Sequence, residues 1–335
     1  MRRILGDVSY HSSLVSAAYA ESTWKKIDCA LNLFNDFCHK KGIVASFPIC
    51  EETLSRFINW LVFERKVKPT SVTAYLSHLK LIHKLRKLNT DSFKSFICKA
   101  QIRGAENLQF YSKEKSANKK VMTLPLLRIL GHAVSISDLS DHSKVLVWAA
   151  YCMAFFGSYR PSEILAKKAN VFNEFETLLW SDVKFIGEDS IQVHNKVTKN
   201  RAPGGEYVSL FVFPFHGCCP VSALKLLAKL ADSKNNLNSP VFKFESGTYL
   251  TKKALNSLIL SHLEPFLGNE ARNYSSKSFR AALPSALASC PHSENDKSIK
   301  QWGRWNSDAF ERYTRLSHKA RRKLFAKFAM ALNSS

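Results

Sequence analysis

The chain has 335 residues, enough for two domains of ordinary size, and 45% of its residues are apolar, enough for two buried cores. Lysine and arginine number 49 against 27 aspartate and glutamate, which gives a net charge of +22. This composition excludes a disordered chain or a disulfide scaffold. The charge predicts a polyanionic partner, since each neutralised phosphate releases counterions, and a basic protein without such a partner is the alternative.

Apolar residues recur at helical spacing through the first third of the chain. The first of these series is expected to be capped by Ser22 or Thr23 and to end at Gly42. The predicted helices cover residues 24–38, 54–62, 69–82 and 91–103. Together they predict a small helical domain over residues 1–110.

The exposed side of the third predicted helix and the residues just after it carry cations with no acidic partner at helical spacing. A solvated face is the ordinary explanation of such a run, but charges of one sign favour a surface that contacts phosphates. The residues expected to make these contacts are Lys80, His83, Lys84, Arg86 and Lys87.

Residues 111–121 are polar and basic without an apolar period, so they predict a linker to a larger domain over residues 122–335. That domain is expected to open with helices near 123–135 and 143–156. Period-two alternation predicts strands at residues 177–180, 183–186, 191–194 and 207–212. A helical pattern returns after residue 220, so we expect a mainly α chain whose second domain holds one small antiparallel sheet.

A candidate for chemistry follows the most apolar predicted helix, which runs into Gly157. The chain then presents Arg160 at a turn, and Pro161 suits the first turn of a new helix. An arginine at the end of a buried helix requires a carboxylate or a phosphate, and Glu163 is placed to orient it. A purely structural Arg–Glu pair is the alternative.

Two further clusters lie near the end of the chain. Lys277 and Arg280, three residues apart, are expected to share one helical face and to point at one anion, with an exposed basic turn as the alternative. The segment 301–315 predicts a capped helix that carries Tyr313 on its second turn. A tyrosine in such a place is more often a core or rim residue than a nucleophile.

Taken together, these clusters resemble the tyrosine recombinase (phage integrase) family, which carries an Arg, a β-hairpin Lys, a His-x-x-Arg, a Gly-His/Trp motif and a Tyr nucleophile. Arg160, with Glu163 three residues later, matches the first arginine of the family, and Arg280 matches the second. Gly303 and Tyr313 are ten positions apart, which is the family's spacing between the motif glycine and the nucleophile. The wording of this last motif is most similar to the Crypton and DIRS-like recombinases of eukaryotic mobile elements.

Some positions depart from the family pattern. Lys277 stands where the family has the histidine of His-x-x-Arg, and Arg304 follows the motif glycine, with Trp305 next. Lysine donates to a phosphate oxygen but shuttles protons near neutrality less easily than imidazole. The hairpin lysine is Lys196 or Lys199, and we favour Lys196 because it directly follows a predicted strand.

The resemblance implies a SAM-like helical core-binding domain and an α+β catalytic domain, which would form a clamp around double-stranded DNA. It implies site-specific cleavage and rejoining through a 3′-phosphotyrosine intermediate, for a mobile element. The catalytic set that it implies is Arg160, Lys196, Lys277, Arg280, Arg304, Trp305 and Tyr313, with Glu163 and Lys199 in support. A domesticated DNA-binding protein that does not cut, or an enzyme similar to type IB topoisomerases, are the alternatives.

No cofactor is expected, because the energy of the cleaved bond stays in the covalent link. His216, Cys218 and Cys219 lie close together but lack a second ligand pair, so we expect no metal site. No segment reaches the ~20 apolar residues of a membrane span. The resemblance also implies a homo-oligomer, a dimer on one site and a tetramer in synapsis, joined by the C-terminal helix. By analogy to the eukaryotic elements, we expect a nuclear protein.

Overall fold

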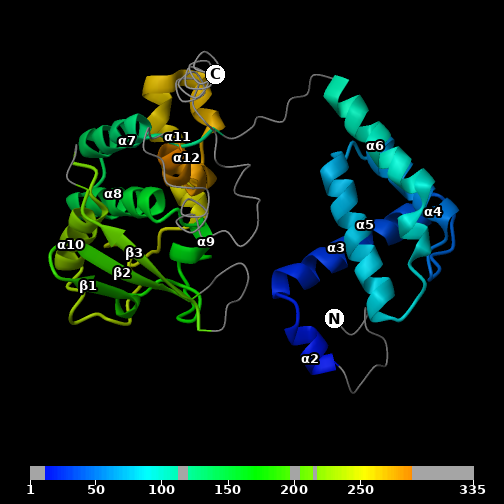
Figure 1. Cartoon of the computed structure of the whole chain (residues 1–335), viewed down its shortest axis with the longest axis horizontal. Coiled ribbons are helices and arrows are strands. Elements are labelled where there is room, and N and C mark those ends of the chain that lie inside the picture. Colours follow the sequence, from blue (N-terminus) through cyan, green and yellow to red (C-terminus); the bar gives the residue numbers. More distant parts are fainter. Residues whose placement is uncertain (1–11, 112–119, 197–203, 214–216, 289–335) are drawn as a thin grey trace, which may run out of the picture. The chain divides into compact units, whose positions relative to one another are not determined.

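The computed structural model describes residues 12–111, 120–196, 204–213 and 217–288. Backbone contacts divide the chain into two compact units, residues 1–116 and 117–335 (Figure 1). As expected, the fold is mainly helical with one small antiparallel sheet. Four of the predicted site residues lie outside the described residues: Lys199, Arg304, Trp305 and Tyr313.

The first unit consists of helices. They are α2 (Ser12–Ala17), α3 (Glu21–Lys40), α4 (Glu51–Asn59), α5 (Pro69–Leu85) and α6 (Phe96–Tyr111), with a π-helical turn at Trp60–Glu64 and a 3₁₀ turn at Asp91–Lys94. The N-cap predicted for α3, Ser22 or Thr23, is wrong, because Ala20 occupies the N-cap without a side-chain hydrogen bond. Glu21 in the first turn instead complements the helix dipole. Pro69 begins α5, where its fixed φ angle fits a helix start.

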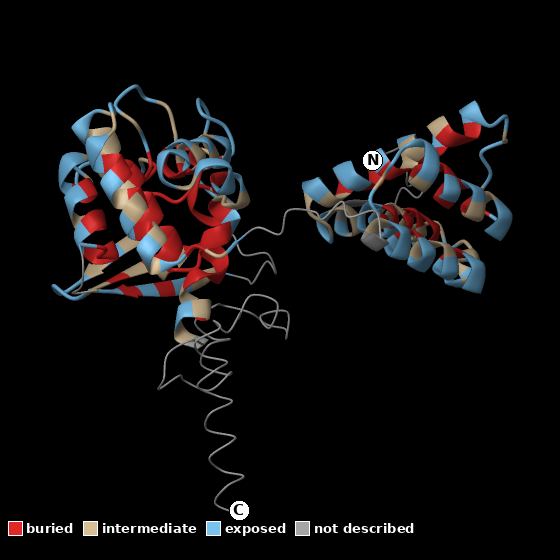
Figure 2. Cartoon of the chain, turned by 90° about the horizontal axis from the view of Figure 1, so that it is seen from above, coloured by how far each residue is buried: buried red, intermediate tan, exposed pale blue. Residues whose placement is uncertain are grey.

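An aromatic cluster forms the centre of the first unit. The rings of Phe34 and Phe57 meet edge to face, with centroids 5.4 Å apart, and Phe37 lies 5.3 Å from Phe57. Trp60 stacks on Phe57 at 6.1 Å. Such pairs contribute about 1 kcal/mol each beyond the burial of their surface. Figure 2 shows that the buried positions of the unit face inward between the helices.

The second unit packs helices around a central one, α8. Its helices are α7 (Leu124–Ile136), α8 (Asp141–Phe156), α9 (Pro161–Ile164), α10 (Pro220–Leu230), α11 (Lys252–Leu267) and α12 (Ala282–Ala288). Three 3₁₀ turns occur at Trp180–Asp182, Gly268–Asn273 and Ser276–Ala281. Because α7 and α10 both contact α8, most of its residues are buried, which explains its nearly continuous apolar sequence.

The sheet has three antiparallel strands in the order β1-β2-β3. They are β1 (Val183–Ile186), β2 (Ser190–Asn195) and β3 (Glu206–Phe211), each within one residue of its predicted bounds. Val193 pairs with Val183 on one side and with Val208 on the other, which fixes the register. The strand predicted at 177–180 is wrong: Leu179 makes only an isolated bridge to Pro240 before the 3₁₀ turn begins.

The wrong prediction of a strand at residues 177–180 has a simple physical cause. Residues 177–180 are buried, and a short apolar run of this kind is equally compatible with a buried strand or a buried connection. Within the described ranges, no helix combines the length and the apolar character that crossing a membrane requires.

Candidate active site

The turn between α8 and α9 presents Arg160. Gly157 ends α8, and a Cβ atom there would lie 2.1 Å from the ring of Tyr159, so the tight turn requires glycine. Ser158 adopts a positive φ of 48°, and Pro161 then begins α9. As the sequence predicted, the arginine sits at a turn directly before a proline-led helix.

Glu163 holds Arg160 through both the backbone and the side chain of the arginine. One carboxylate oxygen, Oε2, accepts from the backbone N–H of Arg160 at 2.9 Å, and the other, Oε1, lies 2.6 Å from its Nη1. The side chain of Glu163 is only 2% exposed, whereas that of Arg160 is 31% exposed. The carboxylate therefore orients the guanidinium while part of the guanidinium faces solvent, where it is able to donate to an anion.

Arg280 reaches the same turn from a distant part of the chain. It lies in the 3₁₀ turn Ser276–Ala281, and the whole residue is 6% exposed. Its Nη1 donates to the backbone carbonyl of Ser158 at 2.5 Å, across 122 positions of sequence. Since Ser158 is two residues before Arg160, this bond ties the second predicted arginine to the turn that carries the first.

Lys277 belongs to the same 3₁₀ turn but is exposed. Residues three apart eclipse each other in a 3₁₀ helix, so Lys277 and Arg280 lie on one side of the turn, with Lys277 nearer to solvent. The Lys277 side chain is thus accessible to a ligand from solvent, whereas Arg280 is buried.

The turn is supported by a buried pair that the sequence did not reveal. The ring of Phe279 stacks on Tyr151 of α8, with centroids 5.8 Å apart, and the Tyr151 hydroxyl lies 3.0 Å from Nδ1 of His262 in α11. Burial raises the pKa of Tyr151 and lowers the pKa of His262, so both stay uncharged. A tyrosine inside an apolar helix carries no sequence signal of this contact.

Lys196 directly follows β2, as expected for the hairpin lysine. Its Nζ lies 2.6 Å from Oδ2 of Asp182 and donates to the backbone carbonyl of Glu174 at 2.6 Å. Asp182 is a further residue that the sequence did not single out.

The basic surface of the first unit is smaller than predicted. Lys84 and Lys87 are exposed, and Lys80 is half-buried. The guanidinium of Arg86, also half-buried, lies over the ring of Phe47 at 5.2 Å, which is a cation–π contact.

The prediction for His83 is wrong. Its side chain is buried, its Nδ1 donates to the carbonyl of Leu79 at 2.8 Å, and its Nε2 accepts from the N–H of Ile49 at 3.0 Å. Burial lowers the pKa of this imidazole, which stays neutral between the rings of Phe47 and Phe93. Helical spacing from the buried Leu79 was the signal that places position 83 on the inner face.

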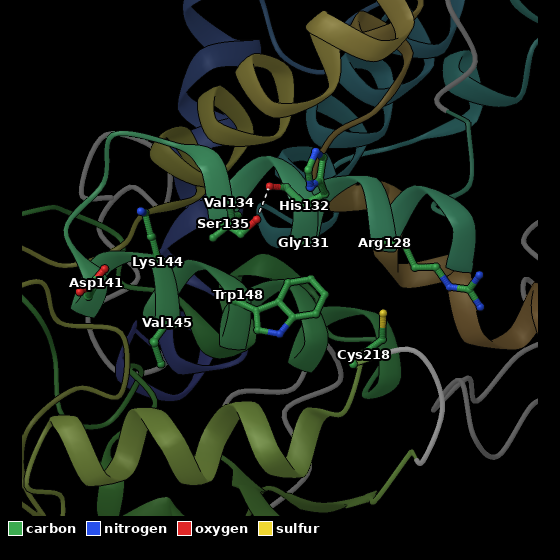
Figure 3. A pocket seen from close by; sticks show the side chains of 11 residues that line it. Arg128, Gly131, His132, Val134, Ser135, Asp141, Lys144, Val145, Trp148 and Cys218 are labelled. Carbon is green, nitrogen blue, oxygen red and sulfur yellow. Dashed lines mark hydrogen bonds between the residues drawn. The ribbon is translucent and has the colours of Figure 1, made fainter.

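Other candidate sites are less informative. Cys218 and Cys219 are buried, and Sγ of Cys219 accepts a hydrogen bond from the N–H of Ser222 at the start of α10. Within the described ranges, no group of three His, Cys, Asp or Glu side chains is arranged to hold a metal ion. A groove of about 800 Å³ lies beside α7 and α8, and none of the predicted catalytic residues that the structure describes lines it. Figure 3 shows Trp148, Arg128 and Cys218 among the side chains around this groove.

Compared by sequence, no protein-family model and no curated protein matches this chain. Compared by structure, it is similar to the XerH site-specific recombinase bound to a palindromic difH substrate in a post-cleavage complex, with a TM-score of 0.56 and 16% identity over 93% of this chain and 80% of that one. The XerH pre-cleavage complex gives a TM-score of 0.53 and 15% identity over 90% and 78%.

A third similar structure is the Tn1549 transposon integrase in complex with circular intermediate DNA, with a TM-score of 0.52 and 10% identity over 88% of this chain and 98% of that one. At these identities the likeness concerns the fold. The helices and the small antiparallel sheet of this chain therefore have the tyrosine recombinase fold.

Proposed function

We propose that this chain is a site-specific DNA recombinase that cleaves and rejoins strands through a covalent 3′-phosphotyrosine at Tyr313. The observation that carries the proposal is the bond from Arg280 to the carbonyl of Ser158. This bond gathers two distant arginines at one turn, on a fold shared with recombinases that have been captured on DNA. The net charge of +22 supports a nucleic acid partner.

The proposed chemistry depends on stabilising the negative charge that develops on the phosphate in the transition state. Attack on a phosphodiester builds negative charge on the non-bridging oxygens, and the guanidiniums of Arg160 and Arg280 would donate to them, each lowering the barrier by about 3 kcal/mol. Glu163 orients the first of these groups before DNA arrives. The exposed ammonium of Lys277 would supply a further donor in place of the histidine of the family pattern.

The covalent step exchanges one phosphate ester for another. The phenol oxygen of Tyr313 attacks phosphorus and its proton passes to water, while the bond to the 5′ oxygen breaks and that oxygen takes a proton from Lys196. In the reverse direction, the 5′ hydroxyl of another strand attacks the phosphotyrosine and reseals the DNA. The bond energy is conserved, so the reaction consumes no nucleotide.

Assembly and location complete the proposal. Exposed Lys84 and Lys87 of the first unit would contact the DNA backbone, which positions a duplex without reading its sequence. We propose that protomers join through the C-terminal helix, as a dimer on one site and a tetramer in synapsis. A role in a eukaryotic mobile element, and hence in the nucleus, follows from the resemblance of the last motif.

Covalent trapping tests this function. The full chain is incubated with nicked duplexes of randomised sequence, from which the short strand 3′ to a cut diffuses away, and adducts are separated on a denaturing gel. We expect an adduct with the wild type and none with Tyr313→Phe. Tyr249→Phe is the matched control, because it removes a hydroxyl elsewhere and leaves the ring contact with Phe172 intact.

Two outcomes would replace the proposal. Duplex binding without any adduct would identify a DNA-binding protein that does not cut, the alternative suggested by the lysine at position 277. An adduct accompanied by relaxation of supercoiled plasmid, but never by joining of two sites, would identify an enzyme that acts like a type IB topoisomerase.

A further inference from the structure

Asp182 occupies a rigid and nearly buried position. It ends the 3₁₀ turn Trp180–Asp182 immediately before β1, and its side chain is 8% exposed. Its Oδ2 accepts from the backbone N–H of Leu179 at 2.8 Å, so the carboxylate is fixed by its own turn. A carboxylate in such a place requires a compensating partner, because burial of an unpaired charge is costly.

That partner is Lys196. Its Nζ lies 2.6 Å from Oδ2 of Asp182 and also donates to the carbonyl of Glu174 at 2.6 Å, and its side chain is 20% exposed. The pair differs from a surface ion pair such as Lys225–Glu188, whose acid is 94% exposed. An ion pair with so little exposure contributes little net stability compared with apolar packing in the same place. Its presence therefore favours a functional role over a stabilising one.

The end of β2 is held from several sides. Asn195 pairs with Glu206 across the sheet, and its Nδ2 donates to Oε1 of that residue at 3.1 Å. Nε2 of His194 donates to the carbonyl of Gly204 at 2.8 Å, and its Nδ1 lies 3.8 Å from the second oxygen of Asp182. A Cβ atom at position 205 would lie 2.6 Å from the carbonyl oxygen of Asn195, so the returning chain packs tightly here.

We infer that Asp182 is a positioning residue, which orients the Lys196 ammonium for proton donation to the departing 5′ oxygen. This inference rests on the proposed function. Asp182 and Glu174 accept two hydrogens of the ammonium, and the third would donate to the leaving oxygen in the proposed complex.

A sulfur leaving group separates this role from a purely structural one. In a substrate whose scissile 5′ oxygen is replaced by sulfur, the leaving group departs as a thiolate, since a thiol has a pKa of about 8.5, and needs no acid. We expect Asp182→Asn to cut the oxygen substrate roughly 10- to 100-fold more slowly than the wild type, and Lys196→Ala roughly 100-fold or more. Both variants should cleave the sulfur substrate at a rate near that of the wild type.

Glu188→Gln is the matched control, because it removes a carboxylate from an exposed lysine pair beside the same sheet. It should resemble the wild type on both substrates. Equal slowing of both substrates by Asp182→Asn would reduce Asp182 to a structural role and overturn the inference. So would unchanged rates on both, or an oxygen-substrate rate for Lys196→Ala equal to that of the wild type.

Failure of the proposed function gives a different result. In that case the wild type itself would cleave neither substrate, whereas failure of the inference leaves a wild type that cleaves both. Asparagine still offers an oxygen to the N–H of Leu179, so the turn is expected to keep its shape. Unchanged circular dichroism of Asp182→Asn would verify that shape before the rates are compared.

Discussion

Replacing Glu163 with glutamine perturbs the candidate site at its most buried acid. The carboxylate accepts two hydrogen bonds, at 2.9 Å from the backbone N–H of Arg160 and at 2.6 Å from its Nη1. Glutamine has nearly the same shape but only one acceptor oxygen. Its amide nitrogen would therefore face one of the two donors, and the charge that attracts the guanidinium would be lost.

The expected loss of stability in Glu163→Gln follows from the burial of the Arg160–Glu163 ion pair. Loss of a hydrogen bond to a charged group costs about 2 kcal/mol. Removing one partner of a fully buried ion pair costs more, about 3–5 kcal/mol, but here 31% of the Arg160 side chain is exposed and water compensates in part. We thus expect Glu163→Gln to lower the free energy of unfolding by about 2 kcal/mol, which is roughly a 30-fold change in the folding equilibrium.

Urea denaturation followed by circular dichroism measures this change. Glu176→Gln is the control, since it breaks an ion pair with Lys167 in which the side chains are 37% and 69% exposed. An exposed pair contributes under about 1 kcal/mol, so the control should fall within about 0.5 kcal/mol of the wild type. If the two variants differ by less than about 0.5 kcal/mol, the carboxylate of Glu163 does not hold the arginine as the structure indicates.

Further predictions concern the first unit and the pH. His83→Phe keeps a ring but leaves the N–H of Ile49 without its acceptor, so we expect a loss of about 2 kcal/mol, visible as faster hydrogen exchange in the first unit but not in the second. Burial lowers the pKa of His83 and of His262 below the ordinary 6.5, so below that pH the unfolded chain binds more protons than the folded chain. The free energy of unfolding should therefore fall as the pH drops from 7 to 5, and a constant urea midpoint over this range would contradict the argument. Lys84→Ala should reduce the slope of log binding constant against log salt by about 1, whereas Lys25→Ala, which removes a lysine already paired with an acid, serves as the control and should leave it unchanged.

Local patterns explain which elements were predictable from the sequence. Along β1, β2 and β3, less exposed and more exposed positions alternate, so a period of two located each of them within one residue. The N-cap of α3 was not predictable in the same way, because Ser22 and Thr23 have good capping chemistry but the helix begins at Glu21, two residues before the start that a Ser22 cap would give. Capping preference is weak beside the packing that decides where a helix starts.

In the candidate site, too, contacts between sequence neighbours were predictable and contacts between distant residues were not. Glu163 was predictable, because a residue three positions after Arg160 in a helix start is a near neighbour. The acceptor of Arg280 is a backbone carbonyl 122 positions away, and no residue type signals such a contact. His83 was assigned to the basic surface from its charged neighbours, although its spacing from Leu79 already placed it on the buried face.

Three cations of the proposed site have acceptors that the protein itself provides. These acceptors are the carboxylate of Glu163 for Arg160, the carbonyl of Ser158 for Arg280 and the carboxylate of Asp182 for Lys196. Ordering a long cationic side chain loses up to about 2 kcal/mol of rotamer entropy. Here the side chains become ordered when the protein folds, so this entropy is not lost again on DNA binding. Removal of an acceptor should consequently slow cleavage at saturating DNA while leaving affinity almost unchanged, because affinity for the duplex resides mainly in exposed lysines that contact phosphates.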